Sequence, residues 1–233
     1  MNVTIGIAAG MIATAMAAAP DYPHAFPREG VKKLFENERL TAWEVVWKKG
    51  VAQPIHRHRY DMAAVYLRYG PIRVTSPDGA VAPVGDPFPV PRPFFQPKGV
   101  THKEEAIGFP AEAPERMAIM FDLKEVSRPA IVPTGGMPTA FPRPGAATPA
   151  IDNTRVLEWD YTWEVGRPVP MHLHERDSVA VFSEGGTIRF TSPNGTVETK
   201  TFAPKDTRFI ARGTIDSEAA VSGHARAVTI ELK

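Results

Sequence analysis

A pair of histidines occurs twice in this chain, within two stretches that resemble each other. The stretches are Gly50-Val-Ala-Gln-Pro-Ile-His56-Arg-His58 and Gly166-Arg-Pro-Val-Pro-Met-His172-Leu-His174. Residues two apart on a β-strand point to the same face of the sheet. Each stretch therefore directs two imidazoles to one side, where they can share a metal ion, and the chain reads as one unit used twice.

The repeat extends well beyond the histidines. At an offset of 116 residues both pairs of tryptophans coincide, as do an Asp, a Gly and a Ser-Pro-x-Gly turn: Trp43/Trp159, Trp47/Trp163, Asp61/Asp177, Gly70/Gly186, Ser76/Ser192. The sequence Ala-Phe-Pro-Arg-x-Gly also recurs, at residues 25–30 and 140–145. Internal repeats of this length indicate two similar domains. We predict domains over residues 25–124 and 140–233, joined by a Pro- and Gly-rich linker over residues 125–139.

Each copy predicts short strands separated by turns. Residues 40–47, and 156–163 in the second copy, alternate as half-buried strands do, and Pro and Gly are frequent between the apolar runs. The pattern indicates an all-β fold, a barrel or jelly roll, with one short helix over residues 31–35. Prolines at 87, 89, 91 and 93 predict an edge or a loop, which would be placed to act as a lid.

Composition restricts the chemistry and the partners. The 233-residue chain has no cysteine, so a metal would be held by His, Asp or Glu. The formal net charge is +1 without a long charged run, which gives no case for nucleic acid or a membrane as partner. We expect a small-molecule substrate.

The first nineteen residues form a separate apolar segment. Residues 1–19 carry no charged side chain and include Ala15-Met16-Ala17, an A-x-A cleavage pattern. They predict a signal peptide and a periplasmic or secreted protein. Since the usual basic start is absent, an N-terminal arm and a cytoplasmic location stay open.

The motifs resemble the two signatures of the cupin superfamily. The first is Gly-x5-His-x-His followed by Gly70 or Gly186, and the second is Pro97-x-Gly99-x-x-His102. Two copies make the chain resemble a bicupin, which implies two tandem double-stranded β-helix (jelly-roll) barrels with a metal inside. Cupins often pair through sheet edges, so the resemblance also implies a homodimer.

The first copy predicts a metal site of three histidines, His56, His58 and His102. Imidazole ligands suit a divalent transition metal, here Fe, with Zn, Ni, Cu or Mn as alternatives. Metal-binding cupins usually add a Glu four or five residues after the second His, and this chain has Met62 and Ala63 there. Asp61 is a candidate replacement, although it could equally hold an Arg or cap a turn.

The second copy has Asp216 where the first has His102. With His172 and His174 it would form a set of two His and one carboxylate, which is the composition of a facial triad for Fe(II). The alternative is a degenerate copy that has lost its metal.

Further residues are candidates for substrate contacts. Glu104 and Glu218 follow the third ligand position by two, so each is either a catalytic base in the pocket or a solvated strand end. Tyr66 would line the site as a second weak catalytic candidate. Arg73 and Arg189 would either bind an anionic substrate inside the barrel or lie outside in water.

These observations favour a metal-dependent enzyme acting on a small organic molecule, with an Fe(II) dioxygenase as the leading hypothesis. A three-histidine site with open positions resembles that of the thiol and diketone dioxygenases among cupins. The alternatives are a cupin lyase or isomerase, and a non-catalytic binding or storage protein.

Overall fold

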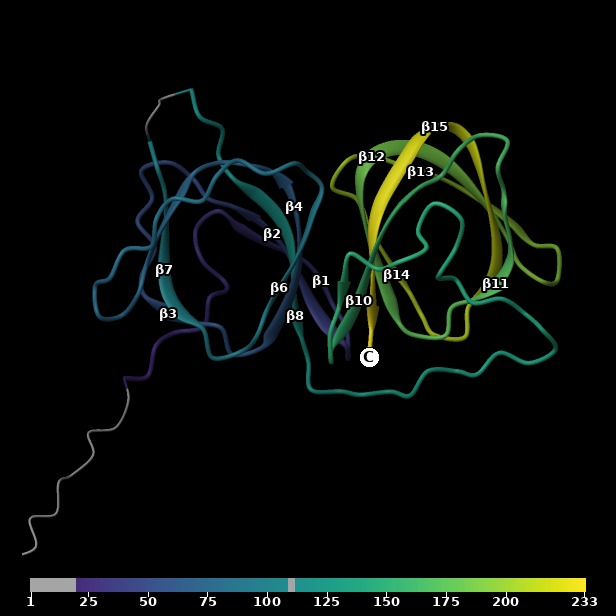
Figure 1. Ribbon diagram of the computed structural model, residues 1–233, viewed down its shortest axis with the longest axis horizontal. Helices are drawn as coiled ribbons and strands as arrows, with labels where there is room; N and C mark the ends of the chain where they lie inside the picture. Colours follow the sequence, from purple (N-terminus) through teal and green to yellow (C-terminus); the bar gives the residue numbers. More distant parts are fainter. Residues whose placement is uncertain (1–19, 109–111) are drawn as a thin grey trace, which may run out of the picture.

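Two β-barrels lie side by side along the long axis of the molecule (Figure 1). This computed structural model describes residues 20–108 and 112–233. The predicted signal peptide or arm over residues 1–19 lies outside the described residues. Within them every regular element is a strand, so the all-β prediction is confirmed.

The first barrel is built from a larger and a smaller sheet. The larger has the strand order β1-β2-β8-β4-β6 and the smaller the order β3-β7-β5, all antiparallel where they pair. The strands are β1 (Val31–Glu36), β2 (Leu40–Val46), β3 (His56–Arg57), β4 (Asp61–Arg68), β5 (Ile72–Thr75), β6 (Arg92–Gln96), β7 (Thr101–Ala106) and β8 (Met117–Leu123).

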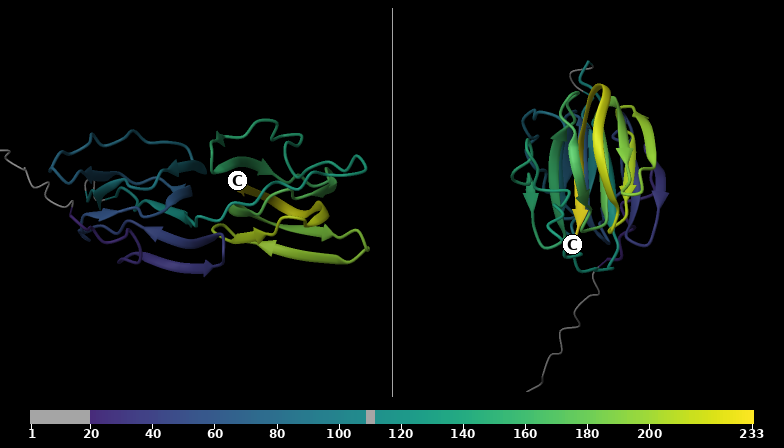
Figure 2. Two further views of the ribbon diagram at one scale, coloured as in Figure 1. Left: turned by 90° about the horizontal axis from the view of Figure 1, so that it is seen from below. Right: turned by 90° about the vertical axis from the view of Figure 1, so that its right-hand side faces the viewer.

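The second barrel repeats this arrangement with longer strands. Its order is β13-β12-β15-β10-β9, with β11 on β15 and β14 on β12. The strands are β9 (Ile151–Asp152), β10 (Val156–Thr162), β11 (Val169–Leu173), β12 (Ser178–Thr191), β13 (Val197–Phe202), β14 (Thr207–Ile210) and β15 (Ile215–Leu232). Because β12 and β15 curve through both faces, this barrel is one continuous sheet; the layers of both barrels are visible in Figure 2.

Strand β4 shows how the sequence builds both a barrel interior and a junction. Met62, Ala64 and Tyr66 pack inside the first barrel, whereas Ala63 and Val65 pack in a cluster shared with the second barrel. Successive residues of a strand point to opposite faces, so a strand with a core on each face is apolar throughout. The run of apolar residues in β4 is thus explained by burial on both sides.

The two barrels share a hydrophobic core at their junction. The cluster contains Phe121 and Ile119 of β8 together with Val228 and Ile230 of β15, all fully buried. Burial of apolar area is the main favourable contribution to association of this kind. The barrels are therefore packed against each other and not merely joined by the linker.

The predicted helix over residues 31–35 is wrong. These residues form β1, in which Val31 pairs with Val45 and Phe35 with Ala42. A five-residue helix is too short to be stable by itself, and pairing with β2 satisfies the backbone hydrogen bonds instead.

The linker and the proline segment are extended. Residues 125–138 contain no strand and run along the second barrel, where Ile131 N–H donates to Glu175 and Leu173 N–H to Pro138 (Figure 1). Pro93 lies on β6, at the edge of its sheet, as the lack of an N–H donor requires.

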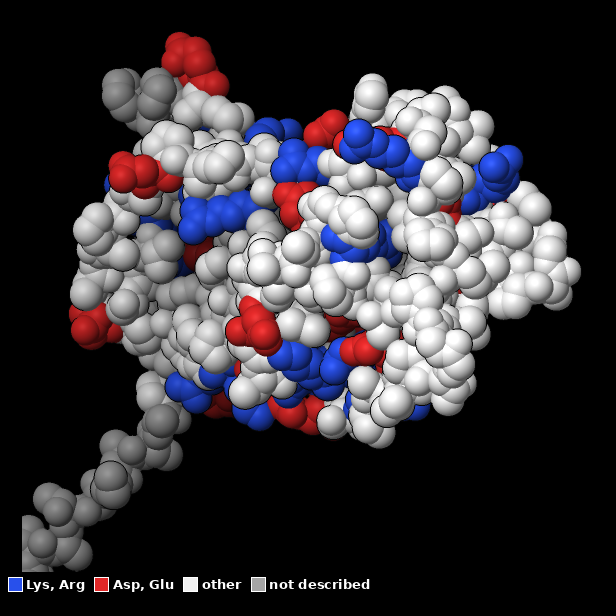
Figure 3. All heavy atoms as spheres, turned by 45° about the vertical axis from the view of Figure 1, so that its right-hand side comes forward, with Lys and Arg blue, Asp and Glu red and all other residues white. Residues whose placement is uncertain are grey.

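The outer surface has mixed charge. On the face shown in Figure 3, Lys and Arg side chains alternate with Asp and Glu side chains without a broad area of one sign. Over residues 20–108 and 112–233, no helix is long and apolar enough to cross a membrane.

Candidate metal centre

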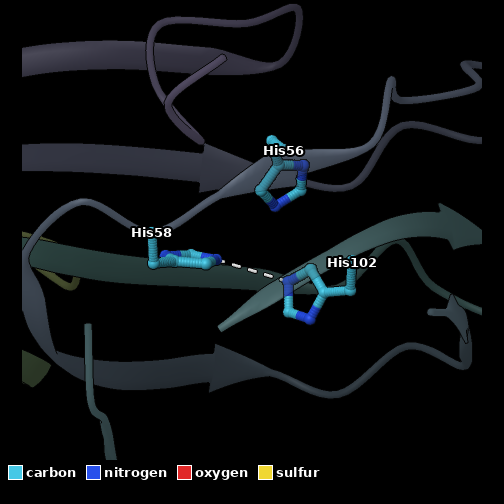
Figure 4. Close-up of side chains that lie close together, drawn as sticks. All are labelled: His56, His58 and His102. Carbon is cyan, nitrogen blue, oxygen red and sulfur yellow. Dashed lines mark hydrogen bonds between the residues drawn. The ribbon is translucent and has the colours of Figure 1, made fainter. Parts of the chain in front are cut away.

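The structure brings His56, His58 and His102 together inside the first barrel. His56 on β3 is paired directly with His102 on β7, and His58 follows two residues after His56. The ring centroids lie 4.9 to 5.2 Å apart, and the ligand atoms of all three lie within 4.8 Å of one another. The three rings converge on a common point (Figure 4), as the repeated motif predicts.

A tight turn delivers His102 to this point. Gly99 has a φ of 92°, a conformation that side chains disfavour, and its N–H donates to the His58 carbonyl at 2.7 Å. His58 N–H in turn donates to the Val100 carbonyl at 2.9 Å. The second signature thus holds two ligands by one pair of backbone hydrogen bonds.

The hydrogen bonds of His56 prepare it as a ligand. Its Nδ1 lies 3.1 Å from the Pro54 carbonyl, which can only accept, so Nδ1 carries the proton and Nε2 carries a lone pair. His56 Nε2 and His58 Nδ1 are buried without a hydrogen-bond partner. A backbone carbonyl behind a ring nitrogen is the usual support of a metal-bound imidazole.

Burial keeps these imidazoles neutral. It lowers the pKa of His56 to about 4 and that of His58 to about 3, and it lowers the pKa of His102 as well. Neutral imidazoles are metal ligands, whereas protonated ones are not. The three residues present therefore fit a divalent transition metal.

Glu104 lies beside the histidines in a fixed orientation. Its Oε1 is 3.8 Å from His102 Nε2, and its Oε2 accepts hydrogen bonds from Arg28 at 2.9 Å and from the Trp47 indole at 2.8 Å. Burial alone would raise the pKa of Glu104, but the Arg28 charge and these donors lower it to about 2. The side chain is only 12% exposed, so the solvated strand end is wrong, and Glu104 is an ionised carboxylate at the site.

Tyr66 lines the same cavity, as expected. Its ring packs against Trp47 and Phe94, and burial raises the pKa of its hydroxyl. It therefore stays a neutral phenol. Phe88 of the proline segment packs on Tyr66 with ring centroids 5.4 Å apart and lines an outer pocket that shares Tyr66 with this cavity.

Asp61 is placed elsewhere, and its assignment as a ligand requires correction. Its Oδ2 lies 3.0 Å from Arg155 of the second barrel, and its Oδ1 accepts the Lys98 N–H at 2.9 Å. The carboxylate is thus used at the barrel junction and at the turn before His102, and it does not join the ligand cluster.

The second barrel holds a different set of metal-ligating groups. His172, His174 and Asp216 converge as predicted: Asp216 Oδ1 is 3.5 Å from His172 Nε2 and 3.7 Å from His174 Nε2. Glu218 joins them, with its Oε1 3.8 Å from His172 Nε2, and it is buried. The Asp216 Oδ1 has no hydrogen-bond partner, although it is buried, which a bound cation would explain.

Glu218 is held as Glu104 is. It accepts hydrogen bonds from Arg143 at 2.7 Å and from the Trp163 indole at 2.6 Å. Since Arg143 and Trp163 are the repeats of Arg28 and Trp47, an Arg–Glu–Trp group supports the cluster in both barrels. For Glu218 too, the solvated strand end is wrong.

Some functional positions were not assigned from the sequence. Arg28 and Arg143 lie in the repeated Phe-Pro-Arg motif, and that repeat was the available signal for a shared role. The sequence assigned the tryptophans to the core, which is correct for their rings. It did not predict that the indole N–H groups of Trp47 and Trp163 donate hydrogen bonds to Glu104 and Glu218. Arg73 and Arg189 are exposed, so the anion-binding alternative is wrong for them.

The comparisons with known proteins rest on structure. No protein-family profile and no curated protein matches the chain. AerE from Microcystis aeruginosa matches at 11% identity with a TM-score of 0.57, over 91% of this chain and 99% of that one. A variant oxalate decarboxylase from Bacillus subtilis matches at 13% identity with a TM-score of 0.55, over 91% of this chain and 79% of that one.

These similarities, with the topology above, define an all-β protein of two tandem jelly-roll barrels with the cupin fold. A cupin domain from Bordetella pertussis also matches at 26% identity over 42% of this chain and 96% of that one, with a TM-score of 0.35. The chain therefore has the cupin fold in two tandem barrels, and the predictions of an all-β and cupin fold are confirmed.

Proposed function

We propose that this protein is a metal-dependent enzyme that acts on a small organic molecule in the first barrel, as an Fe(II) dioxygenase. The observation that carries the proposal is the convergence of three buried, neutral imidazoles beside a cavity of about 250 Å3. Three imidazoles leave coordination positions open on a transition metal. When bound, such a metal supplies Lewis acidity and, as Fe(II), one-electron chemistry with O2.

The residues of the chain have separate roles in this proposal. His56, His58 and His102 hold the metal, and the Pro54 carbonyl orients His56. Glu104 is the ionised group nearest the ligands, where it can accept a proton from the substrate or complete the ligand set. The aromatic wall around Tyr66 excludes water from the reacting groups.

A cupin lyase is the second candidate, and Glu104 favours it. If Glu104 binds the metal, the set becomes three His and one carboxylate, and carboxylate ligands suit Mn. A solved structure of Bacillus subtilis oxalate decarboxylase, at 13% identity, is described as having Mn(II) centres. The two candidates differ in the metal and in the need for O2.

Elemental analysis of the natively purified protein is the first test. We expect close to one Fe per chain in the first barrel, and loss of that metal in His56→Ala. His172→Ala is the matched variant in the second barrel, and His224→Ala, at an exposed position outside both clusters, is the neutral control.

An oxygen-electrode screen of thiols, diketones and phenolic acids follows. Oxygen uptake that His56→Ala abolishes and His172→Ala retains supports the dioxygenase. Mn in place of Fe, with turnover that consumes no O2, supports the lyase instead. A protein that binds no metal in either barrel would overturn both and leave a binding or storage protein.

A further inference from the structure

The barrel interiors beside the two ligand clusters differ in size. In the first barrel the interior cavity measures about 250 Å3 and reaches His58, His102 and Glu104. The corresponding interior space next to His174 and Glu218 measures about 10 Å3. The two barrels therefore differ in the interior space next to the ligand cluster, although a separate cleft reaches His172 of the second cluster.

The difference arises from substitutions at equivalent positions of the repeat. Gln96 pairs with Met62 across the sheet, and Ile210 pairs with Ser178. Since Met62 and Ser178 are equivalent in the repeat, Gln96 and Ile210 occupy equivalent positions. Arg116 and Ala225 are equivalent because their carbonyls accept the N–H of Trp47 and Trp163 respectively. The first barrel therefore has a polar amide and a guanidinium where the second has an alkyl chain and a methyl group.

Bulky side chains fill the second barrel in their place. Val74 corresponds to Phe190 at the offset of 116 residues, and the Phe182 and Phe202 rings stack with their centroids 3.9 Å apart. Arg208 lies over the Phe190 ring at 3.7 Å. The second interior is thus packed, whereas the first retains space lined by polar groups.

Arg116 carries a buried charge that no carboxylate neutralises. The residue is 8% exposed, its Nε donates to the Gly70 carbonyl at 2.8 Å, and within the described residues no Asp or Glu forms an ion pair with it. The Tyr66, Tyr69 and Phe88 rings hold the guanidinium at 5.3 to 5.5 Å. A cation removed from water without an opposite charge is costly, so an anion there would be strongly favoured.

Two further donors in the cavity lack acceptors. Arg28 Nη1 and Gln96 Nε2 are buried without a hydrogen-bond partner, and the Arg28 side chain is only 9% exposed. Both residues line the cavity with Arg116. Native structures rarely leave buried donors unpaired, so a ligand rich in acceptor oxygens would satisfy them.

The remaining walls are apolar. They are formed by side chains of the barrel core, chiefly Phe26, Met62, Ile72, Val74, Phe94 and Met120. An outer pocket shares Tyr66, Phe94 and Arg116 with the cavity and leads toward Arg92 and Phe88 of the proline segment. A ligand with an apolar body and one planar anionic end fits this distribution, since a guanidinium pairs well with a carboxylate.

The larger cleft of the second barrel differs in its charges. It measures about 670 Å3, but each of its arginines is already paired with a carboxylate: Arg143 with Glu218, Arg167 with Glu164 and Arg226 with Asp160. Nothing there requires an anionic ligand.

We propose that the first-barrel cavity binds a small organic acid with an apolar body, whose carboxylate lies against Arg116 in a cavity that also presents the unpaired donors of Gln96 and Arg28. This inference names the substrate class and rests on the proposed function only for what happens after binding. It identifies the first barrel as selective for carboxylic acids over their neutral analogues.

Calorimetric titration of the intact, natively purified protein tests the selectivity. The probes are benzoate and hexanoate, each against its amide. We expect each acid to bind at least about tenfold more tightly than its amide, as loss of a buried charge partner implies. Equal affinities, or no binding of either acid, would overturn the inference. Inorganic phosphate is the competitor, and displacement of benzoate at similar concentrations would overturn the preference for carboxylates.

Variants assign the site to the first barrel. Arg116→Gln should lose the preference for benzoate, Arg116→Lys should retain it by keeping the charge, and Gln96→Ile, which introduces the residue of the second barrel, should weaken binding several-fold. Arg208→Gln is the second-barrel control and should leave affinity unchanged. An unchanged preference in Arg116→Gln, with circular dichroism matching wild type, would refute the role of Arg116.

The same titration in His56→Ala separates this inference from the proposed function. Acid-selective binding that persists without the metal supports the carboxylate site by itself, whatever the metal analysis gives. A protein that binds metal and consumes O2 but does not distinguish benzoate from benzamide would refute the carboxylate site and leave the proposed function standing.

Discussion

Arg39 of the first barrel and Asp177 of the second form a buried ion pair across the barrel junction, with Nη1 and Oδ2 2.5 Å apart. The side chains are 3% and 2% exposed. The repeats of these residues form the reciprocal pair, Arg155 with Asp61, at 3.0 Å. The junction therefore has approximate two-fold symmetry in its charges as well as in its apolar core.

Each aspartate of these pairs also accepts a hydrogen bond from the turn that precedes a candidate metal ligand. Asp61 accepts the Lys98 N–H, before His102, and Asp177 accepts the Arg212 N–H at 2.9 Å, before Asp216. The junction and the two ligand clusters are thus connected through one carboxylate each, which explains the aspartate in the repeated motif.

Removing Arg39 should destabilise the protein substantially. Among the described side chains, Arg39→Ala leaves the buried Asp177 only the more distant Arg128, at 3.6 Å, as a cationic partner, and we expect a loss of about 3 kcal/mol in the free energy of unfolding. Urea denaturation measures it. Arg155→Ala is the matched control, and since that pair is more exposed it should cost about 1 kcal/mol or less. Equal losses would contradict a dominant role for the buried pair.

Glu104→Gln should weaken metal binding in the first barrel. The substitution removes the negative charge 3.8 Å from His102 Nε2 and leaves Arg28 without its partner. We expect a loss of about 10- to 100-fold in metal affinity, measured by competition with a chelator. Glu218→Gln should affect only the second site. A metal affinity unchanged by Glu104→Gln would show that the carboxylate acts on neither the metal nor its ligands.

Glu158 should make stability depend on pH. It is fully buried at the position where the first barrel has Ala42, and no cation of residues 20–108 or 112–233 pairs with it. Burial raises its pKa well above the usual value. The folded state therefore holds this proton more tightly than the unfolded chain, so the contribution to stability is present at acidic pH. It is lost as the pH rises above the unfolded carboxyl value of about 4.3.

Glu158→Gln should remove the loss of folding stability that Glu158 causes as the pH rises. We expect the variant to exceed the wild type by about 1 kcal/mol or more at pH 8, the order of the cost of an unpaired buried polar group, with a smaller difference at pH 4. Denaturation midpoints at both pH values provide the measurement. If the difference in stability between Glu158→Gln and the wild type does not widen with pH, Glu158 is not the source of the pH dependence.

Gly70→Ala should displace the backbone at Arg116, which lines the first-barrel cavity. A Cβ on Gly70 would lie 2.2 Å from the Pro114 carbonyl oxygen and 2.4 Å from the Arg116 nitrogen, both of which are backbone atoms. Overpacking of this kind costs about 1–3 kcal/mol. Gly85→Ala is the control, because a Cβ there meets nothing within 4 Å, and it should leave the melting temperature unchanged. An unchanged melting temperature in Gly70→Ala would show that the backbone at Pro114 can shift at little cost in stability.

The duplication, the all-β class and the convergence of His56, His58 and His102 can all be predicted from the amino-acid sequence. These follow from local rules: strand periodicity places residues two apart on one face, and Gly99 permits the turn before His102. The same rules predicted Asp216 at the third position of the second cluster.

Which charged residues belong to the site depends on the folded barrels. Asp61 and Glu104 are both acidic residues near a ligand in sequence, yet one pairs with Arg155 across the junction and the other with Arg28 inside the barrel. Arg116 and Gln96 come from different strands or their edges, and they line one cavity only because the barrel closes. Burial and charge pairing depend on contacts between residues distant in the chain, and these contacts are absent from any local pattern.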